Sequence, residues 1–283
     1  MAFLFYFHLM NSICLNGKIL PADKPALMVD NKSFRYGDGL FETMKITGKN
    51  ISLEEYHFER FFSGLKQMRF EIPAFLTAGY LKKQILLLCE KNKSEVLGRV
   101  RLSVFRGNGG IYEENNDLQY IIECWPVNES INELNENGFV IDVYPDARKS
   151  CDSFSNIKSA NYLPYVMAAR YAKENKLNEC LVLNMYDRIA DGTTANIFLV
   201  RNEEIMTPAL SEGCVNGVMR RWLMERYKVK ETFFSIDDVL TADELFFTNA
   251  MYGIRWVKQF RDKMYSNLKA SKMHDELLNE LWK

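Results

Sequence analysis

One lysine stands where a side-chain amine could act as a nucleophile. Lys158 lies in the stretch 156–163, NIKSANYL, with small or amide residues around it and an apolar-periodic run after it. A lysine held between an irregular segment and a helix can be kept partly from water, which frees its amine to attack a carbonyl carbon. Taken alone, this stretch favours the simpler interpretation, a solvated lysine at the start of a helix.

Three further features are suited to binding an anion. Residues 213–217, GCVNG, precede a predicted helix that opens at Val218, where backbone N–H groups and the helix dipole favour negative charge. Thr248 and Asn249 could add side-chain donors, and Arg60 could supply a counter-charge from an apolar stretch. Each feature alone more often has a structural role. A phosphate accounts for all three, and a phosphate with one loop-held lysine indicates pyridoxal 5′-phosphate, which a lysine binds as a Schiff base.

The composition is that of an ordinary globular protein. The chain has 283 residues, of which 47% are hydrophobic and 26% are charged, and this length suggests two domains or one large one. Lys and Arg number 36 against 37 Asp and Glu, a net charge of −1. We therefore expect neither a nucleic-acid partner nor attachment to an acidic membrane surface. No stretch reaches transmembrane length.

The chain has six cysteines and three histidines, which could form disulfides or bind a metal. No two cysteines are spaced as CxxC and no histidine lies near them in a zinc-like pattern, so we expect reduced thiols, no metal site and a cytoplasmic protein. The apolar start MAFLFYFHLM lacks the basic region and the cleavage site of a signal peptide. We expect residues 1–11 to be an extension, with Met10 as a natural start.

The elements that must position these residues alternate between strands and helices. Asn16-Gly17 is a strong turn signal and predicts a hairpin over residues 12–20. Ser52 with Glu55 forms the pattern of a capping box, which predicts the start of a helix. In the first half of the chain we predict strands at 41–46, 99–105 and 118–125, and helices at 52–68 and 75–92.

A polar run at 126–137, PVNESINELNEN, is the best candidate for an interdomain linker. It divides the chain into a small N-terminal α/β domain, residues 1–125, and a larger C-terminal domain, residues 138–283, which carries Lys158. In the second domain we predict strands at 139–143, 180–183, 197–200 and 244–247, and helices at 163–175, from 218 and from about 271.

Six segments occur in the order and spacing of one known family: YGDGLFETMKI, HFERF, KSANYL, DGTTANIFLV, TPALSEGCVNGVMRR and ADELFFTNAMYGI. They resemble the fold type IV pyridoxal-phosphate enzymes, which include branched-chain aminotransferases, D-amino-acid aminotransferases and 4-amino-4-deoxychorismate lyase. The resemblance runs from about Ile13 to about Val257. It implies an α/β (α+β) two-domain fold like that of D-amino-acid aminotransferase. A small N-terminal α/β sandwich and a larger barrel-like C-terminal domain would hold the cofactor between them, in a homodimer.

By position, the resemblance implies roles for single residues. Lys158 is the Schiff-base lysine, and Arg60 in HFER matches the phosphate-binding arginine. Val218 and Met219 match a pair of backbone N–H groups on the phosphate, and Asn249 matches a further phosphate or loop contact.

Two positions in the implied cofactor site depart from the family pattern. Asp191 stands where the family usually has a glutamate paired with the pyridine nitrogen, and aspartate is one methylene shorter. Either the strand lies closer, a water bridges the gap, or the ring is a weaker electron sink. Tyr162 resembles the tyrosine that contacts the phenolic oxygen of the cofactor, with a spacing from Lys158 that differs by one.

Three features favour the lyase within this family. Thr43 in FETM stands where the lyase has a proton-relay hydroxyl and branched-chain aminotransferases commonly have glycine. RGNGG, residues 106–110, looks like a lyase loop, and so do the segments CVNGVMR and TNA. The resemblance thus implies conversion of 4-amino-4-deoxychorismate, a small-molecule amine, to pyruvate and the folate precursor 4-aminobenzoate. Arg106 would bind a substrate carboxylate or form a hairpin salt bridge.

Two alternatives stay open. One is an aminotransferase acting on branched-chain or D-amino acids with a 2-oxo acid acceptor, which Tyr162 favours slightly. The other is a non-catalytic relative that keeps the fold for binding or regulation. The joint presence of Lys158, Arg60 and the glycine-rich helix start argues against the second alternative.

Overall fold

The computed structural model describes residues 11–114 and 116–282. The expected extension over residues 1–11 therefore lies, except for residue 11, outside the described residues. By their contacts the residues group into a first unit, Met1–Ile131 with Lys158–Asn161, and a second unit, Asn132–Ile157 with Tyr162–Lys283. Within the described ranges, no helix is both long and apolar enough to span a membrane.

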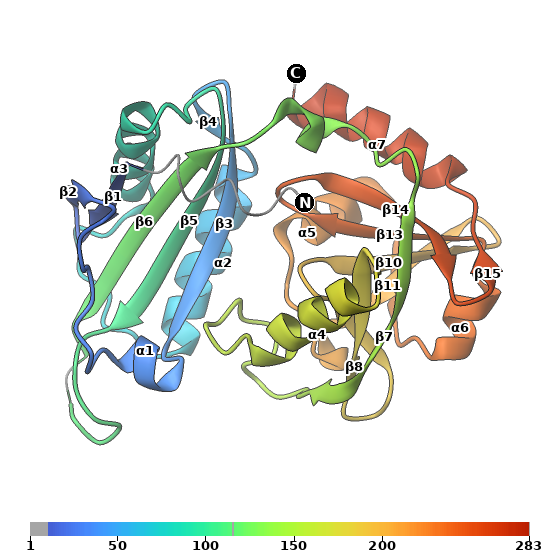
Figure 1. Cartoon of the computed structure of the whole chain (residues 1–283), viewed down its shortest axis with the longest axis horizontal. Coiled ribbons are helices and arrows are strands. Elements are labelled where there is room, and N and C mark those ends of the chain that lie inside the picture. Colours follow the sequence, from blue (N-terminus) through green and yellow to red (C-terminus); the bar gives the residue numbers. More distant parts are fainter. Residues whose placement is uncertain (1–10, 115, 283) are drawn as a thin grey trace. The chain divides into compact units, whose positions relative to one another are not determined.

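The first unit is a six-stranded sheet with two long helices on one face (Figure 1). Its elements are β1 Ser12–Leu15, β2 Lys18–Pro21, α1 Lys32–Tyr36, β3 Gly39–Thr47, β4 Asn50–Ile51, α2 Glu54–Gln67, α3 Ala78–Lys91, β5 Leu97–Arg106 and β6 Leu118–Pro126. The strand order is β2-β1-β6-β5-β3-β4, with every pair antiparallel. Helix α2 packs on β3, and α3 packs on β1, β5 and β6. The strands and helices predicted for this half are confirmed, with ends that differ by about three residues or fewer.

Alternation along β5 separates the two faces of this sheet. Val100, Leu102 and Val104 are buried beneath the helices, while Arg101 and Ser103 between them are only partly buried. Successive side chains of a strand point to opposite faces, so this alternation of apolar and polar residues places the apolar side chains on one face and the polar ones on the other. One face therefore forms the core, and the other face carries polar side chains.

Two local predictions in the first unit have different outcomes. The hairpin turn is confirmed, because Asn16 and Gly17 both adopt positive φ, 49° and 82°, as a two-residue turn requires. The capping box at Ser52 is wrong. Helix α2 begins after Leu53, which has φ 57° and provides no side-chain cap. Ser52 instead continues the β3–β4 hairpin, since its N–H donates to the carbonyl of Lys45 at 2.9 Å.

The second unit is built on a nine-stranded sheet. Its elements are β7 Phe139–Lys149, α4 Leu163–Glu174, β8 Glu179–Asn184, β9 Ile189–Gly192, β10 Asn196–Arg201, β11 Glu204–Pro208, α5 Val218–Arg226, β12 Val229–Thr232, α6 Ile236–Thr241, β13 Glu244–Asn249, β14 Gly253–Phe260, β15 Lys263–Met264 and α7 Leu268–Leu281. The strand order is β12-β11-β10-β13-β14-β7-β8-β9, and β15 pairs with β14. Strand β9, at one end of this order, also contacts β10 and β11 near the other end. The sheet therefore curls back on itself into a barrel-like form.

The core of the second unit lies inside this curled sheet. Buried side chains from several strands meet there, among them Leu181, Ile197, Leu199, Leu245 and Phe247. Helix α4 packs on β7 and β8, α5 on β13, and α7 on β13 and β14. The predicted helix 163–175 is confirmed, and the C-terminal helix begins about three residues earlier than expected. The chain thus has the expected α+β class, with a sandwich of sheet and helices in one unit and a barrel-like sheet in the other.

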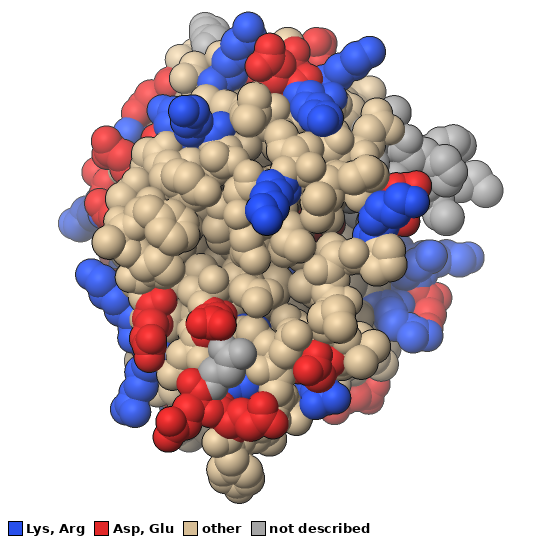
Figure 2. Space-filling model, turned by 90° about the vertical axis from the view of Figure 1, so that its left-hand side faces the viewer, with Lys and Arg blue, Asp and Glu red and all other residues tan. Residues whose placement is uncertain are grey.

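The surface view in Figure 2 shows one face of the molecule. Uncharged residues fill most of the centre of this face, and acidic and basic side chains are interspersed around its rim. Large apolar side chains of the first unit are exposed, among them Val29, Phe34 and Tyr112. Exposed apolar side chains of this kind are common where one protein chain meets another. The homodimer stays a prediction.

Candidate active site

The main chain of Lys158 is held against the edge of β3. Strand β3 pairs with β5 along one side, but on its other side only the last two residues pair with β4. The open part of that edge receives residues 158–161. The N–H of Phe41 donates to the carbonyl of Lys158 at 2.9 Å, and the N–H of Ala160 donates to Gly39 at 2.8 Å. The two bonds flank Ser159 and hold the carbonyl of Lys158 against the strand, as if the segment belonged to the sheet.

This pairing explains why Lys158 groups with the first unit. The sequence assigned it to the larger C-terminal domain, and its neighbours Ile157 and Tyr162 do group with the second unit. The four residues between them contact β3 through the bridge from Ser159 to Leu40. The lysine segment is therefore an insertion of the second unit's chain into the sheet of the first.

The side chain of Lys158 lies on the polar face of this sheet. Its Nζ is 4.6 Å from the centre of the Phe41 ring, and the guanidinium of Arg101 is 3.7 Å from the same ring. Thr43 follows two residues after Phe41, so its side chain leaves the strand on the same face. Arg101 is its direct partner in β5. The structure thus brings the predicted lysine and threonine to one face, together with Arg101, which sequence analysis had not singled out.

Arg60 is bound to a carboxylate of β3. Its Nε donates to Oε1 of Glu42 at 2.8 Å and its Nη2 to Oε2 at 2.6 Å, and the Nδ1 of His57 lies 2.7 Å from Oε2. Glu42 is 1% exposed. Burial by itself raises the pKa of Glu42, but the charge of Arg60 and the hydrogen bond from His57 together lower that pKa to about 2. Glu42 is therefore ionised and orients Arg60, whose side chain stays 14% exposed.

His57 contributes to this group as a neutral imidazole. Burial lowers the pKa of His57, the hydrogen bond and charge of Glu42 oppose this, and the positive charges of Arg60 and Lys158 add to the lowering, so the net shift is downward. Because Nδ1 faces a carboxylate, Nδ1 carries the hydrogen and Nε2 is the acceptor. No residue that the structure describes bonds to that buried Nε2. Sequence analysis missed both His57 and Glu42; the spacing of His57 and Arg60, three residues apart on one helix, was the available signal.

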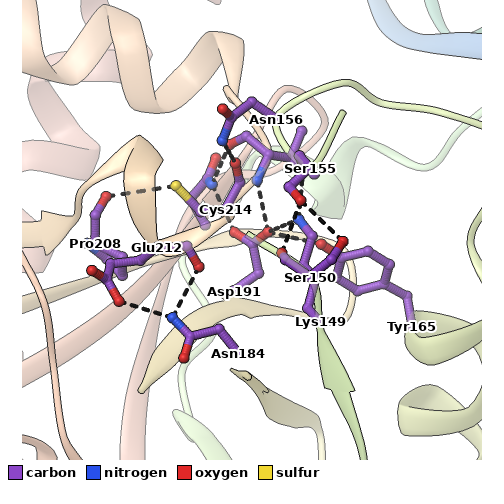
Figure 3. Close-up of polar contacts among 12 residues, drawn as sticks. Lys149, Ser150, Ser155, Asn156, Tyr165, Asn184, Asp191, Pro208, Glu212 and Cys214 are labelled. Atoms are coloured by element: carbon purple, nitrogen blue, oxygen red, sulfur yellow. Dashed lines mark hydrogen bonds and ion pairs between the residues drawn. The ribbon is translucent and has the colours of Figure 1, made fainter. Parts of the chain in front are cut away.

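Asp191 lies in β9 at the centre of a second polar cluster (Figure 3). Its Oδ2 accepts from the N–H of Val215 at 2.8 Å, from the hydroxyl of Tyr165 at 2.9 Å and from Nζ of Lys149 at 3.4 Å. Its Oδ1 accepts from the side-chain amide of Asn196 at 2.9 Å. A carboxylate has about four acceptor positions, two on each oxygen. Oδ2 is thus crowded with donors, while Oδ1 has one donor among the described residues.

Burial dominates the electrostatics of Asp191. The side chain is 2% exposed, and loss of solvent raises its pKa above the ordinary value. The positive charge of Lys149 opposes this rise most strongly, followed by the hydrogen bonds from Val215 and Tyr165. The ionised state of Asp191 therefore depends on its partners.

The glycine-rich loop and the start of α5 belong to the same network. Helix α5 begins after Gly217 without a side-chain cap, so its first N–H groups, those of Val218 and Met219, are available to an anion. A Cβ at Gly217 would lie 1.8 Å from Oδ1 of Asn196, a separation that only glycine avoids. The amide of Asn196 in turn donates to the carbonyl of Val215 at 2.8 Å. Asn196, which sequence analysis did not assign a role, joins the loop to Asp191.

Thr248 and Asn249 differ in what they can offer a ligand. Thr248 is paired directly with Asn196 across β10 and β13, and no described residue bonds to its buried hydroxyl. Asn249 is already engaged, because its Oδ1 accepts from the N–H groups of Met251 at 2.9 Å and Tyr252 at 3.1 Å. Asn249 therefore shapes the β13–β14 turn, and its contact with a phosphate stays a prediction.

The donor set fits pyridoxal phosphate. An uncapped helix start suits the phosphate, and so does the hydroxyl of Thr248, to which no described residue bonds. The remaining acceptor position on Oδ1 of Asp191 suits a protonated pyridine nitrogen. Lys158, whose carbonyl is held by β3, carries a primary amine of the kind that reacts with an aldehyde, and its covalent role stays a prediction.

The two other predicted residues have visible contacts of their own. Tyr162 stacks on Tyr165 with ring centres 4.5 Å apart, and its hydroxyl donates to the carbonyl of Thr193 at 3.3 Å. Arg106 forms a salt bridge with Asp38 and a hydrogen bond to the carbonyl of Met68. Arg106 thus forms a salt bridge, but with Asp38 just before β3 and not within its own β5–β6 hairpin, and its role in substrate binding stays a prediction.

The family model for class IV amino-transferases matches residues 39–260, which contain both polar clusters and Lys158. The chain belongs to the class IV aminotransferase family. An aminodeoxychorismate lyase from Bacillus subtilis (strain 168) is 27% identical over 258 residues, covering 86% of this chain and 84% of the relative. A D-alanine aminotransferase from Bacillus licheniformis is 23% identical and covers 84% of each chain.

Solved structures support the same family fold. The T.th. branched-chain amino acid aminotransferase with pyridoxamine 5′-phosphate superposes with a TM-score of 0.84 at 21% identity, over 95% of this chain and 93% of that chain. Members of the class IV family depend on pyridoxal phosphate, and this chain is an enzyme of that family. The similar proteins divide between a lyase and two kinds of aminotransferase, so membership alone leaves the reaction open.

Proposed function

We propose that the protein is a lyase that converts 4-amino-4-deoxychorismate into 4-aminobenzoate and pyruvate. One observation carries the proposal. Thr43 lies on the face of β3 where the amine of Lys158 rests over Phe41, so a hydroxyl and an amine share one face of one strand. A lyase must protonate the departing group as well as remove a proton, and two groups on one face can divide these tasks. The likeness to the Bacillus subtilis lyase supports the same conclusion.

Lys158 and Thr43 would move the protons. When bound, pyridoxal phosphate supplies a ring that withdraws electrons from the amine-bearing carbon of the substrate. Lys158 would hold the cofactor through its amine and, once the substrate amine has taken its place, would accept the proton from that carbon. Thr43, or Lys158 in turn, gives a proton to the departing enolpyruvyl group. Formation of the aromatic product would favour this step, so a ring that Asp191 supports only modestly would be a sufficient electron sink.

The other predicted residues would bind and orient. Arg60, held by Glu42, and the N–H groups of Val218 and Met219 would bind the phosphate. Asp191 would accept the hydrogen of the ring nitrogen through Oδ1.

The remaining assignments concern the ring oxygen and the substrate. Tyr162 would contact the phenolic oxygen of the cofactor, and Asn249 would support the loop beside the phosphate. Arg101, directly opposite Thr43, is a cation placed to attract a substrate carboxylate, and Arg106 is a second.

A product assay tests the proposal. The purified protein, supplied with pyridoxal phosphate, should convert 4-amino-4-deoxychorismate to 4-aminobenzoate and pyruvate. In a parallel assay, mixtures of a branched-chain or D-amino acid with a 2-oxo acid should exchange amines slowly or not at all. Rapid exchange without 4-aminobenzoate would overturn the lyase and establish the aminotransferase, the second candidate in this family.

Two variants connect the assay to the site. Lys158→Ala should remove the absorbance band of the lysine-bound cofactor that borohydride reduces, and a surviving band would identify another lysine. Thr43→Val removes only the hydroxyl and should slow 4-aminobenzoate formation about a hundredfold or more, while the absorbance band stays. An unchanged rate would exclude Thr43 from proton transfer.

A further inference from the structure

Lys149 is a buried cation to which the mechanism above gives no role. It is the last residue of β7 and is 8% exposed. Its Nζ donates to the carbonyl of Ser155 at 2.9 Å and lies 3.4 Å from Oδ2 of Asp191. The same nitrogen is 5.2 Å from the centre of the Tyr165 ring (Figure 3). A buried ammonium is costly unless it is paired, so this placement calls for an explanation.

Three titratable groups face Asp191 from the elements packed around β9. Lys149 comes from β7, Tyr165 from α4, and Cys214 from the loop before α5. Burial raises the pKa of the Cys214 thiol to about 12, and burial with the charge of Asp191 raises the pKa of Tyr165 well above its ordinary value. Both groups are therefore neutral at physiological pH. Of the three, Lys149 is the one that brings positive charge to Asp191.

We propose that Lys149 is a positioning residue that keeps Asp191 ionised and its Oδ1 directed at the ring nitrogen of the bound cofactor. The proposal rests on the role proposed above for Asp191. Lys149 binds Oδ2 together with Tyr165 and Val215, which leaves Oδ1 as the oxygen with an acceptor position to spare.

The chemistry of the aspartate makes this support necessary. A buried carboxylate without a nearby cation tends to take up a proton. A protonated Asp191 would carry no charge and could no longer hold the ring nitrogen in its protonated form. Because aspartate is shorter than the glutamate usual at this position, its carboxyl group lies nearer its own backbone, within reach of Lys149 behind it.

A purely structural role is the competing explanation. Lys149 also holds the carbonyl of Ser155, three residues before Lys158, so its loss could simply loosen that loop. The two explanations differ in one respect. A loosened loop weakens binding of any pyridoxal-like ligand, whereas an uncharged Asp191 weakens binding only of a ligand that has a ring nitrogen.

The experiment therefore compares two ligands. Cofactor-free protein is titrated with pyridoxal phosphate and, separately, with 1-deazapyridoxal phosphate, in which a carbon replaces the ring nitrogen. The ratio of the two dissociation constants is measured from pH 6 to pH 9. Wild type should prefer pyridoxal phosphate. Lys149→Met and Lys149→Gln should reduce that preference about tenfold near neutral pH, one pKa unit being tenfold in the ionised fraction. The pH at which the preference develops should rise by about one to three units.

Two controls keep the charge or remove a different one. Lys149→Arg should restore the preference because it restores the cation. Arg148→Met removes the neighbouring cation, which points to the other face of β7 and pairs with Asp187, and should leave the ratio unchanged. In the Asp191→Asn background, Lys149→Met should produce no further loss of preference.

The outcomes test the role of Lys149 and the role of Asp191 separately. If Lys149→Met and Lys149→Gln weaken both ligands equally, Lys149 is structural and the inference is overturned. If wild type binds pyridoxal phosphate and 1-deazapyridoxal phosphate equally well, Asp191 does not pair with the ring nitrogen. The inference about Lys149 is then overturned as well. Neither result depends on which reaction the enzyme catalyses.

Discussion

Glu42 and Asp191 are both buried carboxylates, one in each unit, and they have opposite electrostatics. Glu42 is 1% exposed and Asp191 is 2% exposed, and in both cases burial alone raises the pKa. For Glu42 the partners more than offset burial, and its pKa falls to about 2. For Asp191 the partners offset burial only in part, and its pKa stays raised.

The partners account for the difference. Glu42 receives two charge-assisted bonds from the fork of Arg60 at 2.6 and 2.8 Å, whereas Asp191 has a lysine at 3.4 Å and otherwise neutral donors. Paired hydrogen bonds from a guanidinium are among the strongest that proteins form. Burial thus does not decide the charge of a carboxylate; the geometry of the nearest cation does. Glu42 is a permanent anion that orients Arg60, and Asp191 is one whose charge can respond to a ligand.

The largest expected effect is on stability when the permanent anion is removed. Glu42→Gln leaves the guanidinium of Arg60 without its buried counter-charge and should cost about 3–5 kcal/mol of unfolding free energy. Chemical denaturation measures the loss. Glu55→Gln, on the exposed side of α2, is the control and should change stability by less than about 0.5 kcal/mol. A similar small change in both variants would show that the Glu42–Arg60 pair contributes little.

The pH dependence of stability should have opposite signs at the two carboxylates. The folded pKa of Glu42, about 2, lies below its ordinary value of 4.5, so its contribution is present above pH 4.5 and is lost as the pH falls toward 2, by about 3 kcal/mol. The folded pKa of Asp191 lies above its ordinary value of 3.8, so its contribution is present below that value and is lost as the pH rises through the folded pKa.

Unfolding free energies of wild type, Glu42→Gln and Asp191→Asn across pH measure these two slopes. The gap between wild type and Glu42→Gln should narrow as the pH falls below 4.5. Wild type should lose stability relative to Asp191→Asn as the pH rises above 3.8. If the two stability differences between wild type and variant changed with pH in the same direction, Glu42 and Asp191 would not have opposite pKa shifts.

A smaller effect should follow from crowding the network around Asp191. Gly217→Ala places a Cβ 1.8 Å from Oδ1 of Asn196, and the forced shift should cost about 1–3 kcal/mol and loosen the bond from Asn196 to Asp191. Gly79→Ala in α3 is the matched control, because its Cβ meets no atom within 4 Å, and it should gain about 0.5–1 kcal/mol. Equal effects at the two glycines would mean that Asn196 yields without cost.

The smallest expected effect comes from removing one neutral donor. Tyr165→Phe deletes the hydroxyl that lies 2.9 Å from Oδ2 of Asp191 and should cost about 1 kcal/mol. The pKa of Asp191 should rise further, because this hydroxyl stabilises the ionised form. Tyr144→Phe, in the same buried cluster, is the control in denaturation experiments. A pKa of Asp191 that does not change in Tyr165→Phe would leave Lys149 and the amides as its main support.

Local patterns in the sequence were sufficient for much of the fold. The Asn16-Gly17 turn, the strand at 99–105 and the helix at 163–175 each depend on patterns among a few neighbours, and all three appear as predicted. Short strands such as β9 and β12, four residues each, carry too few residues for a pattern and were not predicted. Ser52 was mistaken for a cap because a hairpin hydrogen bond to Lys45 competes for it.

The candidate site was predictable where family motifs mark single residues and not where distant residues meet. Lys158, Arg60 and Asp191 stand in recognisable segments. Lys149 is separated from Asp191 by 42 residues and sits in no motif, so only the curled sheet reveals the pair. The same holds for Glu42 and Arg60, 18 residues apart, whose pairing depends on how α2 lies on β3.

The insertion of residues 158–161 along β3 has a consequence for the newly made chain. Until those residues emerge during synthesis, the strand from Gly39 onward presents unpaired N–H and C=O groups along one edge. Such an edge is a template for pairing with strands of other chains. The segment that carries Lys158 also covers part of this edge, so fragments that end before it should be less soluble than the whole chain.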